Sequence, residues 1–260
     1  MTGPLPDAAF EHIRDHAWLR ANNLFVAEGR HVATRLIQSP LFRTVALMVT
    51  PTAQVAMAEA IDAVDPHKRP EILVRTQAEL DAITGFRLHQ GCVALGKRPV
   101  MPVELPGATD DPIIALERVR DPDNVGSIIR SAAALGGAGL LLGPECADPF
   151  YRKAVRTSMG SVFTLPLGAA PEWPEALRRL KARGRVIVAL TPDGRDVLSA
   201  ARAAVGNRPA VLVLGSEGEG LTPEARALAD FEANIPMAST ADSLNVAVAA
   251  AVALYAWRTD

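Results

Sequence analysis

The sequence has few cysteines, no long apolar run and no excess of basic charge. Its two cysteines, Cys92 and Cys146, show neither a CxxC motif nor metal-ligand spacing, which argues against a disulfide framework and a cysteine-held metal. The longest apolar run, residues 246–257, has 12 residues, whereas a membrane-spanning helix needs about 20. With no apolar leader at the start of the chain, we expect no membrane partner, no metal and a cytoplasmic protein.

Histidine is missing from most of the chain. All five histidines precede residue 90, so chemistry in the remainder has to use Arg, Glu, Asp, Ser, Asn and the backbone. The net charge is -2, and the part through Asp111 carries 11 basic and 13 acidic residues. Contact with a nucleic acid would therefore need a local basic surface.

A proline-rich stretch divides the chain. Residues 97–112, KRPVMPVELPGATDDP, hold four prolines and show no helical or strand period, which is typical of a linker. We therefore predict an N-terminal domain at residues 1–96, a linker at 97–111 and a second domain at 112–260. Both domains would have an ordinary size.

Strand-like and helical segments alternate on both sides of the linker. The first part shows strand-like FVAE, TVALMVT, EILV and GCVALG, with helical spacing in GRHVATRLIQS. The second part shows strand-like IIALERV, GLLLG, VFTLPL, RVIVAL, AVLVLG and EANIPM, with helical stretches at Ser127–Leu135, Glu172–Ala182, Pro223–Asp230 and Leu244–Arg258. This alternation predicts an α/β fold with a mostly parallel sheet covered on both faces, preceded by a small α/β domain.

Three polar loops follow predicted strands of the second domain. They are RDPDNVGS after IIALERV, GSEGEG after AVLVL and PMASTADSLN after EANI. Parallel sheets bind ligands at the carboxyl ends of their strands. GSEGEG lacks the dinucleotide spacing, and its two glutamates would repel a pyrophosphate. A neutral or cationic ligand therefore fits better, with a nucleotide-dependent oxidoreductase of the same architecture as the alternative.

The loops also carry a family resemblance. DPDNVGSIIRSAAALG, VLVLGSEGEGL and IPMASTADSLNVAVAAAVALYAW resemble, in order, the three motifs of the SpoU/TrmH-like RNA ribose 2′-O-methyltransferases. RKAVRTSMGSVF resembles their connecting segment, and the first part resembles the RNA substrate-binding domain often fused ahead of it. The resemblance implies a C-terminal trefoil knot, S-adenosylmethionine as cofactor, RNA as partner and a homodimer with the site near its interface. The apolar final helix suits that interface.

The resemblance also implies which residues form the site. The positions that match polar site residues of the family are Asn124, Arg130, Glu217, Ser243 and Asn245. Those expected to hold the cofactor, largely through their backbones, are Leu214, Gly215, Gly218, Ile235, Met237 and Leu244.

Methyl transfer to ribose sets the expected roles of these residues. The reaction needs the 2′-oxygen placed in line with the methyl group, and this oxygen must lose a proton. Arg130 can pair bidentately with a neighbouring phosphate and so fix the ribose, while Asn124 can hold the loop or the ribose. Because free arginine stays protonated, the proton acceptor is left unassigned. Glu217 is an alternative acceptor, and its other interpretation is that it holds Arg130 or the loop.

Simpler interpretations exist for these residues. Arg130 could be a surface arginine that snorkels to solvent, and Glu217 could be a solvated loop charge. Asn124 and Ser127 could cap the helix predicted to begin at Ser127, and Ser243 could cap the last helix. Arg152, Lys153 and Arg156 are interleaved with aromatic residues, which favours RNA contact, but a solvated helix face fits them as well.

Ribosomal RNA is favoured over transfer RNA because of the extra domain. The alternatives are a non-catalytic RNA-binding module of the same fold and methylation of a base nitrogen. The enzyme is favoured because three separate motifs occur together, in the order found in the family.

Overall fold

The computed structural model describes residues 7–103, 105, 110–238 and 243–258, apart from the side chain of His89. The chain forms two compact units, residues 1–100 with 149–164, and residues 101–148 with 165–260. The first boundary falls inside the predicted linker, of which residues 104 and 106–109 lie outside the described residues. The segment 149–164, expected in the second domain, belongs to the first unit.

The first unit is built on a four-stranded sheet with the order β1-β4-β2-β3. β4 is antiparallel to β1 and β2, and β3 runs parallel to β2. The strands are β1 (Leu24–Glu28), β2 (Thr44–Val49), β3 (Glu71–Val74) and β4 (Cys92–Lys97). The helices are α1 (Ala8–Glu11), α2 (His16–Ala21), α3 (Arg30–Gln38), α4 (Pro51–Asp62), α5 (Gln77–Thr84) and α7 (Arg152–Thr157), with single turns η1 (Pro66–Lys68), η2 (His89–Gly91) and η3 (Ser161–Phe163).

Aromatic packing and a charge pair join segment 149–164 to the rest of the first unit. The rings of Phe150 and Phe163 lie 5.4 and 5.5 Å from that of Phe25 on β1. The Arg152 guanidinium pairs with Glu28 at 2.8 Å. Since Phe25 and Phe163 are fully buried, this segment completes the core of the first unit.

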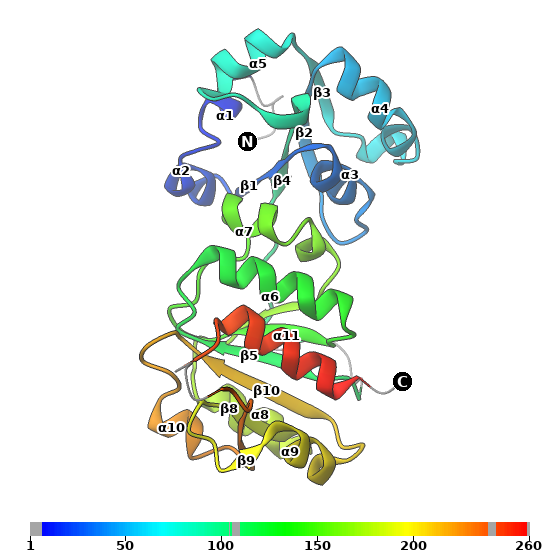
Figure 1. The fold of residues 1–260 in the computed structure, drawn as a ribbon. Coiled ribbons are helices and arrows are strands. Elements are labelled where there is room, and N and C mark those ends of the chain that lie inside the picture. The colour runs from blue at the N-terminus through cyan, green and yellow to red at the C-terminus, as the bar shows by residue number, and fades with distance from the viewer. Residues whose placement is uncertain (1–6, 104, 106–109, 239–242, 259–260) are drawn as a thin grey trace. The chain divides into compact units, whose positions relative to one another are not determined.

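The second unit carries the predicted parallel sheet, with seven strands in the order β7-β6-β5-β10-β8-β11-β9 (Figure 1). All its strand pairs are parallel. The strands are β5 (Ile113–Glu117), β6 (Gly139–Leu142), β7 (Leu167–Ala169), β8 (Val186–Leu190), β9 (Asp196–Val197), β10 (Ala210–Gly215) and β11 (Phe231–Asn234). The helices are α6 (Pro122–Ala134), α8 (Glu175–Ala182), α9 (Leu198–Val205), α10 (Pro223–Arg226) and α11 (Val246–Trp257).

Helices cover both faces of this sheet, as the continuous apolar strands predict. α8 and α10 pack on one face, where Ala176 and Leu177 join alternate strand residues such as Val211 and Val213 in one core. On the other side α6 lies against α11, which also contacts β10 and α9 (Figure 1). The predicted α/β architecture is therefore confirmed, while the trefoil knot stays a prediction.

Several predicted element boundaries are wrong. The helix expected from Ser127 begins at Pro122, because Pro favours the first helical position and the side chain of Asp121 caps it by accepting from Asp123 N at 2.9 Å. The last helix begins at Val246 rather than Leu244. VFTLPL is not one strand, because Ser161–Phe163 forms a 3-10 turn in the first unit and β7 starts only at Leu167.

Candidate active site

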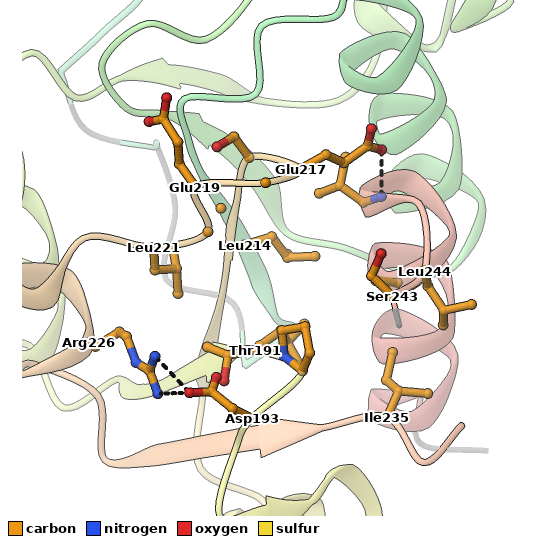
Figure 2. A pocket seen from close by; sticks show the side chains of 18 of the residues that line it. Thr191, Asp193, Leu214, Glu217, Glu219, Leu221, Arg226, Ile235, Ser243 and Leu244 are labelled. Carbon is orange, nitrogen blue, oxygen red and sulfur yellow. Dashed lines mark hydrogen bonds and ion pairs between the residues drawn. The ribbon is translucent and has the colours of Figure 1, made fainter. Parts of the chain in front are cut away.

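The carboxyl ends of the central parallel strands surround a pocket of about 430 Å³ (Figure 2). Its walls are residues 190–193 at the end of β8, residues 214–221 at the end of β10, Ile235 and Met237 after β11, and the start of α11. Leu214, Leu221 and Ile235 give it apolar surface, and the glycine-rich loop presents backbone groups. The pocket lies where ligands bind in parallel α/β sheets.

The residues expected to hold the cofactor all line this pocket. They are Leu214, Gly215, Gly218, Ile235, Met237 and Leu244, joined by the predicted polar residues Glu217 and Ser243. They come from two loops that are separate in sequence and meet at one end of the sheet. The structure therefore brings the second and third motifs together around one cavity.

A hydrogen-bonded cluster joins all three motifs beside the pocket. Asn245 Nδ2 donates to Glu217 Oε1 at 2.6 Å and to Asn124 Oδ1 at 2.9 Å. Asn124 Nδ2 donates to the same Glu217 oxygen at 3.3 Å, and the Val246 backbone N–H does so at 3.2 Å. Three residues thus fix one carboxylate, which Figure 2 shows turned toward the start of α11.

The contacts show that neither Asn124 nor Ser243 is a helix cap. Asn124 lies inside α6, whose cap is Asp121, so it is not the helix cap. Asn245 is the cap of α11, because its Oδ1 accepts from the backbone N–H groups of Ala247 and Val248 at 3.0 and 3.4 Å. Ser243 precedes that cap and is exposed at the pocket lining.

Arg130 stands apart from this cluster. It is exposed on α6, it is not among the residues that line the pocket, and it has no hydrogen bond or ion pair with another described residue. Six helical residues separate it from Asn124, a rotation of about 240° around the helix axis. The interpretation in which Glu217 holds Arg130 therefore does not apply within one chain.

The two glutamates of the glycine-rich loop point in different directions (Figure 2). Glu219 pairs with Arg118 at 2.8 Å and with Arg120 at 3.4 Å, and Arg120 also pairs with Glu145. The Glu145 carboxylate raises the pKa of Arg120 above its usual value. Arg118 and Arg120 neutralise the charge of Glu219. Of the two loop glutamates, it is therefore Glu217 whose carboxylate adds negative charge beside the pocket.

The loop after β8 was missed as part of the site. Thr191 and Asp193 line the pocket with Arg226 of α10. Nη1 and Nη2 of Arg226 each lie 3.1 Å from Asp193 Oδ2 (Figure 2). The hydroxyl of Thr191 and the guanidinium of Arg226 lower the pKa of the Asp193 carboxyl below its usual value. The signal was present, because TPDG follows the predicted strand RVIVAL and the same strand-end rule applies.

The predicted RNA-binding residues lie on α7 in the first unit. Arg152 pairs with Glu28, and its guanidinium lies 4.3 Å from the ring centre of Phe86. Lys153 is half-buried and Arg156 is exposed. Phe150, one of the aromatic residues just before these basic residues, is buried and therefore packs in the core instead of facing solvent. RNA contact by α7 stays a prediction.

Within the described ranges, no group of three or more His, Cys, Asp and Glu side chains could hold a metal ion. None of the helices built from those residues is both long and apolar enough to cross a membrane.

Comparison with known proteins adds the family. Residues 111–255 match the model of the SpoU rRNA Methylase family. The chain belongs to this family. An uncharacterized tRNA/rRNA methyltransferase of Mycobacterium tuberculosis is 38% identical over 237 residues, which cover 89% of this chain and 80% of that protein.

Solved structures of the same fold extend over both units. The AdoMet-bound rRNA methyltransferase of Sinorhizobium meliloti has a TM-score of 0.81 at 29% identity and covers 97% of this chain and 94% of its own. An RNA 2′-O ribose methyltransferase has a TM-score of 0.78 at 26% identity, covering 97% and 95%. The SpoU family is thus supported by motifs, family model and fold together.

Proposed function

We propose that this protein transfers a methyl group from S-adenosylmethionine to a ribose 2′-hydroxyl of RNA, with ribosomal RNA favoured over transfer RNA. Membership of the SpoU family makes it an RNA methyltransferase that uses S-adenosylmethionine. The ribose as acceptor is supported by the resemblance of the first motif and by the similar 2′-O ribose methyltransferase. The observation that carries the proposal is the cluster of Asn124, Glu217 and Asn245 at the edge of the pocket.

The pocket fits the cofactor in size and chemistry. Its volume of about 430 Å³ falls in the usual range for small-molecule sites, roughly 300–1,000 Å³. Leu214 and Ile235 offer apolar surface for an adenine ring, and the charge of Glu217 suits a sulfonium cation. The hydroxyl of Ser216 is buried at the lining and has no partner among the described residues, so a bound ligand can satisfy it.

The residues of the cluster hold the reacting groups in place. When bound, S-adenosylmethionine supplies an electrophilic methyl group. Glu217 is fixed through Oε1 by Asn124, Asn245 and the start of α11, which leaves its second oxygen for a substrate or cofactor group. Such fixed polar groups reduce the reorganisation needed when reactants meet.

Arg130 acts on the RNA in this proposal. Its exposed guanidinium has no ion-pair partner among the described residues and suits the bidentate recognition of a phosphate. By binding the phosphate next to the target nucleotide, Arg130 orients the ribose. The acceptor of the 2′-hydroxyl proton is left unassigned, with the free oxygen of Glu217 as the candidate on the protein.

The proposal includes a homodimer through α11. Val248, Val252 and Tyr255 are 48%, 38% and 72% exposed, and their spacing of four and three residues puts them on one helix face. Exposed apolar stripes of this kind are typical of protein interfaces. The resemblance implies a homodimer with the site near its interface, and the apolar last helix suits that interface.

A methyl-transfer assay tests the reaction. Purified protein is incubated with labelled S-adenosylmethionine and either ribosomal or transfer RNA from cells without the modification, followed by digestion and mass spectrometry of the nucleosides. We expect a 2′-O-methylated nucleoside, chiefly from ribosomal RNA. Arg130→Ala should lower the rate roughly 100-fold, because misplacement of a reacting group by about 1 Å costs that much.

Arg178→Ala is the matched control, because Arg178 is an exposed arginine on the surface of α8 that pairs with Glu175 of the same helix. It should transfer methyl groups at the wild-type rate. A methylated base in place of a methylated ribose would refute the ribose assignment. Tight cofactor binding without transfer to naked or ribosome-assembled RNA would favour the non-catalytic binding module.

A further inference from the structure

Two residues at the end of β5 reach the glycine-rich loop from outside the pocket. Glu117 and Arg118 come just before the first motif, and neither lines the cavity. Glu117 pairs in register with Gly215, the last residue of β10. Although it is a carboxylate, Glu117 is only 1% exposed, so a specific partner has to satisfy it.

That partner is Thr222, at the end of the loop. Its backbone N–H donates to Glu117 Oε2 at 3.0 Å, and its hydroxyl donates to Oε1 at 2.8 Å. The same hydroxyl caps α10 by accepting from Ala225 N at 3.3 Å. Glu117 therefore fixes the point where the loop leaves the pocket and α10 begins.

Arg118 holds the middle of the loop. Its Nη1 lies 2.8 Å from Glu219 Oε2, and its Nη2 donates to the carbonyl of Gly220 at 3.2 Å. Arg118 itself has a φ of +56°, in the left-handed region that is unfavourable for a residue with a Cβ. Gly220 has a φ of +65°, and its N–H donates to the Ser216 carbonyl at 3.0 Å. The fork of Arg118 adds a second restraint to this glycine, which is flexible in isolation.

We propose that Glu117 and Arg118 are positioning residues that preorganise loop 215–221 for S-adenosylmethionine. This inference rests on the proposed function for the identity of the ligand. The two residues act on the cofactor through residues 219, 220 and 222, since neither of them lines the pocket. A site held by supporting contacts of this kind loses affinity when they are removed, even though the lining residues stay intact.

Arg118→Gly separates positioning from stability. Glycine tolerates the positive φ, and the lost pair with Glu219 is partly exposed and contributes little to folding. We expect the unfolding midpoint to stay within a degree or two of wild type. The Kd for S-adenosylmethionine, measured by titration calorimetry, should rise roughly tenfold, and KM for the cofactor should rise while kcat changes less.

Glu117 is tested by a pair of substitutions. Glu117→Ala leaves Thr222 N–H without its partner and should weaken both cofactor binding and stability. Glu117→Gln keeps an oxygen for that N–H and should restore most of the affinity. Arg178→Ala, outside the loop, should bind like wild type. Arg118→Gly and Glu219→Gln should be non-additive in Kd, because they remove the same contact.

Hydrogen exchange of the ligand-free protein distinguishes a failure of the positioning role from a failure of the proposed function. Amides of residues 216–222 should exchange faster in Arg118→Gly than in wild type if the arginine restrains the loop. Unchanged cofactor affinity and unchanged exchange in Arg118→Gly would overturn the positioning role. Wild-type protein that binds no S-adenosylmethionine would instead refute the proposed function, while the exchange rates would still decide whether Arg118 restrains the loop.

Discussion

Asn245 combines two tasks in one side chain. Its Oδ1 caps α11, and its Nδ2 holds Glu217 and Asn124. Asn245→Ala removes both and should lower the free energy of unfolding by about 1 kcal/mol. Asn245→Ser keeps a capping oxygen but loses the reach to Glu217, so it should retain most of the stability and still lose methyl transfer. Thermal unfolding and the transfer assay measure the two effects, and a fully active Asn245→Ser would show that the contact with Glu217 is dispensable.

The two cysteines are expected to react slowly with alkylating agents in the folded protein. Burial raises the pKa of Cys146 to about 11 and that of Cys92 to about 12. Because the thiolate is the reactive form, Cys146 should react with iodoacetamide roughly 100-fold more slowly at pH 8 than a free thiol, and faster as the pH rises toward 11. Mass spectrometry of the alkylated protein measures this. The protein unfolded in guanidinium is the control and should react at the ordinary rate, whereas rapid labelling of the folded protein would contradict the burial argument.

Elements of the second unit were largely predictable, because apolar strands such as Ile113–Glu117 and Ala210–Gly215 are buried on both faces and show as continuous apolar runs. The start of α6 was missed because RDPDN also fits a turn, although its capping Asp121 followed by a proline at the first helical position is a local signal for a helix start. Supporting residues were missed for a different reason. The roles of Glu117 and Asp193 depend on Thr222 and Arg226, which lie 105 and 33 residues away.

The glycine-rich loop after β10 depends on one close backbone approach. A Cβ on Gly215 would lie 2.3 Å from the Gly220 carbonyl carbon, so Gly215→Ala has to displace the loop that lines the pocket. We expect methyl transfer to fall roughly 100-fold.

Gly184→Ala is the control, because a Cβ there meets nothing within 4 Å, so that the strain comes from the positive φ of +84° alone. It should cost about 1 kcal/mol of stability and keep cofactor affinity. Wild-type activity in Gly215→Ala would show that the loop tolerates displacement.

At the scale of the whole molecule, the chain does not divide at its proline-rich stretch alone. The segment 149–164 returns to the first unit, where Phe150 and Phe163 pack against Phe25. Sequence periodicity could not show this, because the segment lies between strands β6 and β7 of the second unit and its partners are more than 100 residues away. RKAVRTSMGSVF therefore connects two strands of one unit while completing the core of the other.

The dimer is the remaining proposal at this scale, and α11 allows a direct test. Ala250, Ala253 and Leu254 bury one side of the helix completely, whereas Val252 and Tyr255 leave the other side apolar and exposed. Val252→Glu together with Tyr255→Glu should leave the fold intact and convert a dimer into the 27.6 kDa monomer, because a charge buried in an interface without a partner is costly. Light scattering after size exclusion measures the mass.

Val55→Glu, at a site 79% exposed on α4, is the matched control and should stay dimeric. Methyl transfer should fall with the dimer, because the resemblance places the site near the interface. A wild-type monomer that transfers methyl groups would refute both the interface and its part in the reaction.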